Sequence, residues 1–213
     1  MKISDARVLI TGGCGFIGSH LVDEYLAAGA EKVVIYDHET KEWPANIHHL
    51  KKDKRVNRVG GDIDHFSQVV DAIKSQRCNV VEHLAADLEV ARGIENMQKE
   101  LRTNINGTLS VLQAAQQQNV ELIQYASSGA VYGRSPGKHG EWDVPEPHWP
   151  YGVSKFAGEQ YCMQFHRLYG MKVNAFRYGI VYGEREWFGR VLTMFLKRMV
   201  LEGKPPIIYG DGK

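Results

Sequence analysis

The sequence lacks the features that would place the protein in a membrane or on a polyanion. No apolar run approaches the ~18 residues that a membrane-spanning helix needs. Lysine plus arginine number 26 and aspartate plus glutamate 25, so the net charge is +1 and no long block of one sign is present. With 43% hydrophobic residues, the chain is predicted to be soluble and globular, without nucleic acid or membrane partners.

Cysteine is scarce as well. Cys14, Cys78 and Cys162 are odd in number and have no CxxC spacing, so the sequence predicts neither a metal site nor a disulfide framework. The amino-terminal MKISDARVLITGG has too short an apolar core for a secretory signal and no small-residue cleavage site. We therefore expect a cytoplasmic protein whose cysteines are small, buried or half-buried side chains.

Short β-branched runs alternate with helical patterns along the first half of the chain. The runs lie at 7–11, 33–36, 55–59, 78–82 and 121–126. Such alternation is typical of βαβ units, in which helices cover both faces of a parallel sheet. The sequence therefore predicts an α/β fold with a doubly wound parallel sheet.

Two long helices are predicted between and after the last of these strands. Apolar residues recur at steps of three and four from Leu101 to Ala115 and again from Ala157 to Leu168. We expect both stripes to pack against the sheet, and Gly170 to end the second helix with a positive φ. Segment 134–150 is rich in proline and glycine, which predicts a long loop before Tyr151.

A glycine-rich turn joins the first strand to the first helix. Gly12, Gly15 and Gly18 allow a tight turn, close approach of the backbone to a pyrophosphate and close packing of helix on strand. Asp37 lies nineteen residues past Gly18, at the end of the second run, where a carboxylate would meet the ribose hydroxyls of adenosine. A carboxylate there repels a 2′-phosphate, so the motif predicts NAD rather than NADP. The alternative is a structural turn with a surface aspartate.

A second acidic residue follows the third run. Asp62 lies at a strand's carboxyl end, where it is placed to receive the adenine amino group. It is equally well placed to cap the helix that starts near His65. Both interpretations remain open at this point.

Tyr151 and Lys155 form the second chemical pattern. Residues four apart share a helix face, so the ammonium of Lys155 can favour the ionised form of the Tyr151 phenol and let it act as a base. The fifth run ends in Ser127 and Ser128, at the edge where ligands bind in open α/β sheets. Either serine could instead satisfy the backbone of the loop.

Together these segments resemble a known family. The motifs are TGGCGFIG at 11–18, GDI at 61–63, HLAA at 83–86, SSGAVYG at 127–133, YGVSK at 151–155 and RYGIVYG at 177–183. They are similar to the extended short-chain dehydrogenase/reductase family, and within it to NAD-dependent nucleotide-sugar epimerases of the UDP-glucose 4-epimerase type. The resemblance implies a Rossmann-type NAD-binding domain over 1–180, which carries the catalytic residues, and the beginning of a truncated substrate domain over 181–213.

The resemblance also implies roles for individual residues. The implied catalytic residues are Ser128, Tyr151 and Lys155. The implied NAD-binding residues are Gly12, Gly15, Phe16, Ile17, Gly18, Asp37, His38, Asp62, Ile63, Leu84, Ala85, Ala86, Asn104, Tyr151, Lys155 and Tyr178. The implied substrate-binding residues are Ser128, Tyr151, Ile180, Phe188 and Tyr209.

The implied reaction is epimerisation of a nucleotide sugar through a transient 4-keto intermediate. The alternatives are a dehydratase, decarboxylase or reductase of the same family, or a non-catalytic NAD-binding sensor or scaffold. Ile180 stands where the family usually has an asparagine that touches the substrate diphosphate, so the sugar nucleotide is expected to be bound differently or to be a different one. The resemblance further implies a homodimer through the two long helices.

Overall fold

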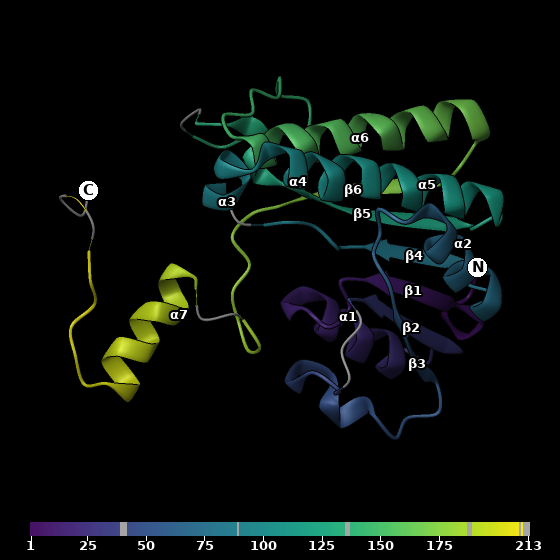
Figure 1. The fold of residues 1–213 in the computed structure, drawn as a ribbon, viewed down its shortest axis with the longest axis horizontal. Coiled ribbons are helices and arrows are strands. Elements are labelled where there is room, and N and C mark those ends of the chain that lie inside the picture. The colour runs from purple at the N-terminus through teal and green to yellow at the C-terminus, as the bar shows by residue number, and fades with distance from the viewer. Residues whose placement is uncertain (39–41, 89, 135–136, 187–188, 209, 211–213) are drawn as a thin grey trace. The chain divides into compact units, whose positions relative to one another are not determined.

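The computed structural model describes residues 1–38, 42–88, 90–134, 137–186, 189–208 and 210. A six-stranded parallel sheet forms the centre of the first part of the chain (Figure 1). Its strands are β1 (Arg7–Thr11), β2 (Lys32–Asp37), β3 (Val56–Gly60), β4 (Val80–His83), β5 (Leu122–Ser128) and β6 (Val173–Tyr178). The first five strands confirm the runs predicted from sequence, whereas β6 was not predicted.

The strands lie in the order β3-β2-β1-β4-β5-β6. The chain builds outward from β1 to β3 and then crosses back to β4, so the direction of winding reverses between β1 and β4. In open parallel sheets a ligand binds at the carboxyl ends of the strands beside such a reversal. The prediction of a doubly wound α/β fold is confirmed.

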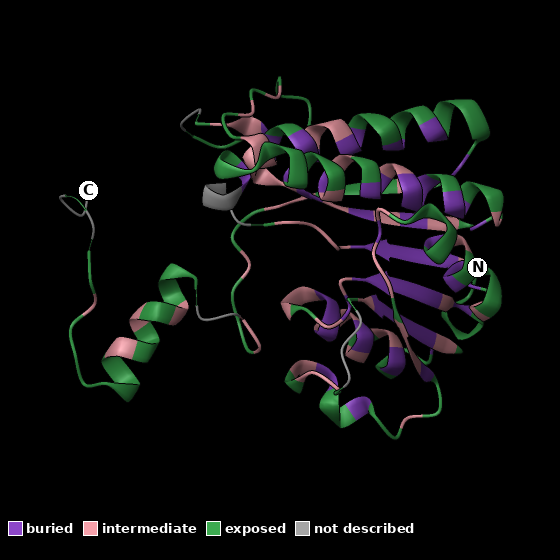
Figure 2. Cartoon of the chain, viewed as in Figure 1, coloured by how far each residue is buried: buried purple, intermediate pink, exposed green. Residues whose placement is uncertain are grey.

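Alternating residues of the strands supply two separate cores. Val8, Ile10 and Ile35 belong to one buried cluster, and Leu9 and Val34 belong to the other. Successive side chains of a strand point to opposite faces, so apolar runs of this kind need cover on both sides. Figure 2 shows the central strands as the most continuously buried part of the molecule.

Helices provide that cover. On one face lies α1 (Phe16–Ala27), which begins directly at the glycine turn, and on the other lie α2 (Phe66–Gln76), α5 (Gly107–Gln117) and α6 (Pro150–Tyr169). The helix predicted from Leu101 to Ala115 forms: α4 (Met97–Leu101) continues through a π-helical turn, η3 (Arg102–Asn106), into α5 without a break. The short helix α3 (Val90–Glu95) precedes it.

The second long helix differs in detail from its prediction. It ends at Gly170 with a φ of +68°, as expected. Of its predicted apolar stripe, Phe165 is buried, but Tyr161 and Leu168 are exposed. The buried face also carries Lys155, Gly158, Glu159 and Cys162. Lys155 and Glu159 bond to the end of β5, whereas Cys162 packs with Phe165 in the hydrophobic core.

The chain divides into two compact units, Met1–Gly179 and Ile180–Lys213. The second unit contains α7 (Val191–Leu196) and a π-helical turn η5 (Lys197–Leu201), neither of which has a buried residue. Residues 207–208 form no strand.

Within the described ranges, no helix is long and apolar enough to cross a membrane. The three cysteines are free thiols: Cys78 and Cys162 are buried and Cys14 is half-buried, as predicted.

Candidate active site

The glycine turn between β1 and α1 is built as its sequence predicts. Gly12 has a φ of +71°, a conformation that favours glycine. A Cβ on Gly18 would lie 2.3 Å from the Gly12 carbonyl oxygen, so only glycine allows α1 to start this close to the turn. Gly15 precedes α1, and no side chain caps the start of that helix. Free N–H groups at a helix N-terminus suit a phosphate anion.

Asp37 lies beside this turn. One carboxylate oxygen accepts a hydrogen bond from the Cys14 backbone N–H at 2.9 Å, and the other accepts one from the His38 N–H at 2.8 Å. The end of β2 is thereby fixed against the glycine turn, and His38 is exposed. The structure thus brings together the two parts of the predicted dinucleotide motif.

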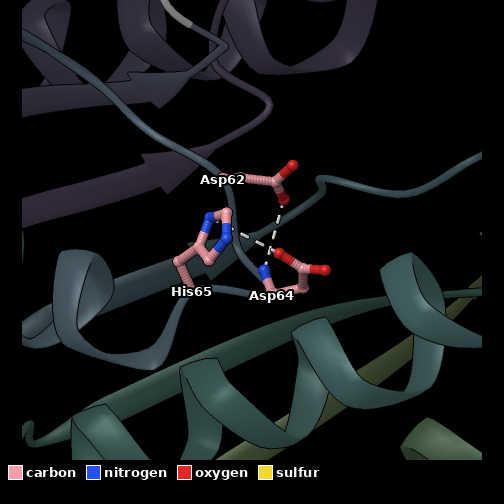
Figure 3. Close-up of side chains that lie close together, drawn as sticks. All are labelled: Asp62, Asp64 and His65. Carbon is pink, nitrogen blue, oxygen red and sulfur yellow. Dashed lines mark hydrogen bonds and ion pairs between the residues drawn. The ribbon is translucent and has the colours of Figure 1, made fainter.

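Asp62 belongs to a small polar cluster after β3, shown in Figure 3. Its side chain accepts a hydrogen bond from the Asp64 N–H at 3.2 Å, while the residue that caps α2 is His65, without a side-chain bond. The helix-cap interpretation of Asp62 is therefore wrong. Asp64 lies 3.6 Å from the His65 ring and 3.8 Å from the guanidinium of Arg102, whose positive charge offsets that of the carboxylate. We assign no metal to the cluster.

Five other residues implied for NAD lie in the helix that follows β1 or after the carboxyl end of β4. Phe16 and Ile17 are half-buried in the first turn of α1, and Leu84, Ala85 and Ala86 follow β4. The N–H groups of Leu84 and Ala85 donate to the Thr11 hydroxyl at 3.2 and 3.1 Å, which ties this segment to the end of β1.

Ile63 and Asn104, both implied for NAD, are buried. The Ile63 side chain lies in the core beneath Gly107, where an added Cβ would meet it at 2.6 Å. Asn104 is 1% exposed. Its amide oxygen accepts from the Asp87 N–H at 2.7 Å, and its amide nitrogen donates to Asp87 and to Glu100. Its amide is therefore engaged within the protein, and it holds the π-helical turn against the segment after β4.

Ser128 and Tyr178 end neighbouring strands and are partners in the sheet register. The Ser128 hydroxyl accepts a hydrogen bond from the Ala130 N–H at 3.1 Å, so it caps the 3-10 turn η4 (Gly129–Tyr132). This is the loop contact that the sequence left open as an alternative. The hydroxyl still has its own proton to donate.

Tyr151 lies in the first turn of α6, next to that 3-10 turn. A Cβ on Gly152 would lie 2.5 Å from the Ala130 carbonyl oxygen, so the start of α6 packs directly on the turn that follows Ser128. The Lys155 ammonium lies 5.8 Å from the centroid of the Tyr151 ring and donates to the Ala126 carbonyl oxygen at 2.8 Å. The structure thus gathers Ser128, Tyr151 and Lys155 at one edge of the sheet.

Lys155 is 3% exposed. Burial lowers the pKa of its ammonium from 10.5 to about 8, and the nearby Glu100 carboxylate opposes part of that shift. Glu100 is itself buried and accepts hydrogen bonds from Ser154 and from Asn104. The lysine is therefore a charge held in a largely dry region.

The sequence analysis missed a group of polar residues around this lysine. Glu159 is buried one helical turn after Lys155 and accepts hydrogen bonds from Ser127 and Arg177. The spacing of Lys155 and Glu159 places both on one face of α6, which could have indicated the carboxylate. Arg177 could not be paired with it from sequence, because β6 was not predicted.

Three residues implied for the substrate stay untested by geometry. Ile180 is 88% exposed and begins the second unit. Phe188 and Tyr209 lie outside the described residues.

The chain is similar to a family of known enzymes. It matches the NAD dependent epimerase/dehydratase family over residues 8–213. It is 35% identical over 210 residues to a putative UDP-glucose 4-epimerase from Methanocaldococcus jannaschii. This match covers 96% of this chain and 66% of that relative. It is 32% identical to the UDP-glucose 4-epimerase of Mycolicibacterium smegmatis, in a match that covers 97% of this chain and 66% of that protein. The chain thus spans slightly less than two thirds of the length of these relatives.

Solved structures agree with this. UDP-glucose 4-epimerase from Thermotoga maritima, solved with UDP-glucose, superposes with a TM-score of 0.87 at 31% identity, covering 97% of this chain and 66% of that one. The Thermus thermophilus enzyme, solved with NAD, gives 0.85 at 36% identity, covering 93% and 64%. Because the family match extends along nearly the whole sequence, this chain belongs to the NAD dependent epimerase/dehydratase family.

Proposed function

We propose that this chain binds NAD and carries the catalytic residues of a nucleotide-sugar epimerase, of the kind that inverts carbon four of a UDP-sugar. The observation that carries the proposal is that two elements, β5 and α6, bring three side chains to one edge of the sheet. The end of β5 supplies Ser128, the first turn of α6 supplies Tyr151, and the next turn supplies the buried Lys155. A binding module would need neither a phenol nor a buried ammonium at this spacing.

The residues at the glycine turn fit NAD. The uncapped start of α1 suits the pyrophosphate, and the Asp37 carboxylate, fixed beside the turn, suits the adenosine ribose diol. Asp62, Leu84, Ala85 and Ala86 and, across the reversal point, Tyr178 complete the proposed binding surface. When bound, NAD would supply the acceptor for a hydride from the sugar and the donor for its return.

The chain's own residues would manage the proton. Tyr151 would take the proton of the sugar hydroxyl while Lys155, 5.8 Å from its ring centroid, stabilises the phenolate. Ser128 would donate its hydroxyl proton as a hydrogen bond to the sugar oxygen that is being oxidised. Epimerisation follows if the ketosugar turns over in the site before hydride returns.

An epimerase is favoured over a dehydratase by the two residues after Ser128. Loss of water across carbons five and six of the sugar needs an added acid and base close to the catalytic hydroxyl. In the dehydratases that this sequence resembles, these groups are carboxylates that directly follow the catalytic hydroxyl. Here Gly129 and Ala130 follow Ser128, and neither can transfer a proton. Decarboxylase and reductase activities remain the alternatives to test.

The rest of the assignment is part of the same proposal. Residues 1–180 would form the NAD-binding domain and 181–213 the beginning of the substrate domain, with Ile180, Phe188 and Tyr209 near the sugar nucleotide. The unit boundary after Gly179 supports this division.

We also propose a homodimer formed through α5 and α6, in the cytoplasm. Val153, Met163 and Leu168 leave apolar side chains exposed along α6, which favours cover by a second copy. The free cysteines suit a reducing compartment. Sedimentation of the purified protein tests the dimer.

Incubation with NAD and a panel of UDP, dTDP and GDP sugars, with products identified by NMR, tests the activity. We expect interconversion of two UDP-sugars that differ at carbon four. Tyr151→Phe should abolish the reaction, whereas Tyr161→Phe, on the same helix but exposed, should not. Binding of NAD without conversion of any sugar would favour the sensor or scaffold.

A further inference from the structure

Arg177 joins four segments of the first unit through one side chain. It lies in β6, directly before Tyr178, and pairs with Ser127 in the sheet register. Its guanidinium donates to Glu159 from two nitrogens, at 2.9 and 2.8 Å, in a forked ion pair. The two side chains are only 19% and 8% exposed. A forked pair of this kind fixes the orientation of both partners more strictly than a single contact does.

The Glu159 end of this pair reaches the catalytic elements. Glu159 lies one helical turn after Lys155, and one of its oxygens also accepts a hydrogen bond from the Ser127 hydroxyl. Ser127 immediately precedes Ser128. The pair therefore connects the helix that carries Tyr151 and Lys155 with the strand that carries Ser128.

The other end of Arg177 holds the long loop before α6. One guanidinium nitrogen donates to the Tyr132 hydroxyl at 2.8 Å and to the Glu141 carbonyl oxygen at 3.2 Å. Tyr132 in turn donates to the Gly140 carbonyl oxygen at 2.9 Å, and its ring stacks on His139 with centroids 4.6 Å apart. The described part of this loop, residues 137–149, is thus tied to β6 by side chains.

From this arrangement we propose that Arg177 is a positioning residue, which anchors the 137–149 loop and holds the elements of Ser128, Tyr151 and Lys155 in one arrangement. The role in catalysis rests on the proposed function, whereas the anchoring of the loop does not. Arg177 bonds to Glu159, Tyr132 and the backbone of the loop, so it would act on the catalytic groups through those partners. Its loss would leave the buried Glu159 charge uncompensated and release the loop.

Limited trypsin digestion, without NAD or sugar, tests the anchoring. Lys138 is exposed within the loop, so cleavage after it reports how often the loop opens. Arg177→Met should raise the rate of this cleavage, followed by mass spectrometry, by at least about tenfold. The matched control is Arg167→Met, which removes an exposed arginine near the end of α6 and should leave the rate unchanged.

Two further variants keep the test valid if Arg177→Met folds poorly. Tyr132→Phe removes the hydroxyl and its hydrogen bonds to Arg177 and Gly140 but keeps the ring under the guanidinium, so it should raise Lys138 cleavage by a smaller factor. Arg177→Lys keeps a positive charge opposite Glu159 but cannot form the fork. Arg177→Lys should be more thermally stable than Arg177→Met, while its loop is still cleaved after Lys138 faster than in the wild type. This result separates anchoring of the loop from a general loss of stability.

Kinetics test the consequence for catalysis. In the variants that fold, kcat should fall by about tenfold or more while KM for the sugar and the affinity for NAD change little, because preorganisation of the catalytic groups is lost rather than binding. Unchanged Lys138 cleavage in both Arg177→Met and Tyr132→Phe would overturn the anchoring. Faster cleavage with normal kcat would overturn the positioning role. A wild-type chain that converts no sugar would instead refute the proposed function, and the cleavage result would still decide the anchoring.

Discussion

Replacement of the buried lysine of the site should stabilise the fold while it stops turnover. Burial lowers the pKa of Lys155 from 10.5 to about 8, so the folded state holds its proton less tightly than the unfolded state does. At about 1.36 kcal/mol per unit, a charged Lys155 costs the folded state about 3 kcal/mol at neutral pH. Lys155→Met removes that cost.

The variant also loses favourable contacts. The hydrogen bond to the Ala126 carbonyl oxygen and the ring contacts with Tyr125 and Tyr151 together contribute about 1–2 kcal/mol. We therefore expect Lys155→Met to be more stable than the wild type by about 1–2 kcal/mol at neutral pH. Turnover should be lost, because the phenolate of Tyr151 no longer has an ammonium beside it.

The pH dependence gives the sharper test. Below pH 8 both states of the wild type carry the charge, and the full penalty is present. Between about pH 8 and 10.5 the folded state is neutral at this position while the unfolded state still binds the proton, so the penalty disappears as the pH rises. The stability of the wild type relative to Lys155→Met should therefore increase by about 3 kcal/mol across this window.

Urea unfolding of both proteins across this pH range measures the difference. Lys74→Met, which removes an exposed lysine of α2, is the matched control and should change neither stability nor its pH dependence. The reasoning would be refuted if Lys155→Met were less stable than the wild type at neutral pH by a constant amount that does not change up to pH 10.5.

Four other predictions follow from the site. Because the Asp37 carboxylate lies beside the glycine turn, NAD should bind at least about tenfold more tightly than NADP by calorimetry, and equal affinities would remove Asp37 from its proposed role. Gly18→Ala should weaken NAD binding, since its Cβ would lie 2.3 Å from the Gly12 carbonyl oxygen and force the turn to shift. Tyr151→Phe should lower kcat by ~10²–10⁴ with NAD affinity and melting temperature nearly unchanged, and a wild-type rate would show that the base lies elsewhere. With Gly129 and Ala130 after the proposed catalytic serine, Ser128, mass spectrometry should detect no 4-keto-6-deoxy sugar, and such a product would contradict the epimerase assignment.

Local patterns predicted the parts of the fold that local forces determine. The glycine turn and the Gly170 terminus of α6 depend on residues close in sequence, and Asp37 was found by its spacing from the glycine turn, as the family motif has it. By contrast, β6 was not predicted, because its central residues are exposed and its sequence lacks a buried apolar run. Its place beside β5 is set by pairing with a strand about fifty residues earlier.

Contacts between residues far apart in sequence were also missed among the polar residues around the site. Asn104 was assigned to NAD by resemblance, yet its amide is engaged by Asp87, Glu100 and Ser154. The i, i+4 spacing of Glu100 and Asn104 could have indicated the first of these contacts, but Asp87 and Ser154 come from separate segments that no spacing indicates. The same holds for Arg177 and Glu159, which meet only because β6 lies beside α6 in the folded chain.

The two adjacent serines at the end of β5 illustrate what the backbone adds. Sequence alone left both hydroxyls available at the sheet edge, but successive residues of a strand point to opposite faces. The burial pattern of β5 alternates along its whole length, and Ser127 falls on the face of Ile123 and Tyr125, where its hydroxyl donates to Glu159. Ser128 falls on the other face, beside Tyr178 and the turn that meets the start of α6. The alternation of side chains along β5 therefore separates Ser127, which supports α6, from Ser128, which is proposed to contact the sugar.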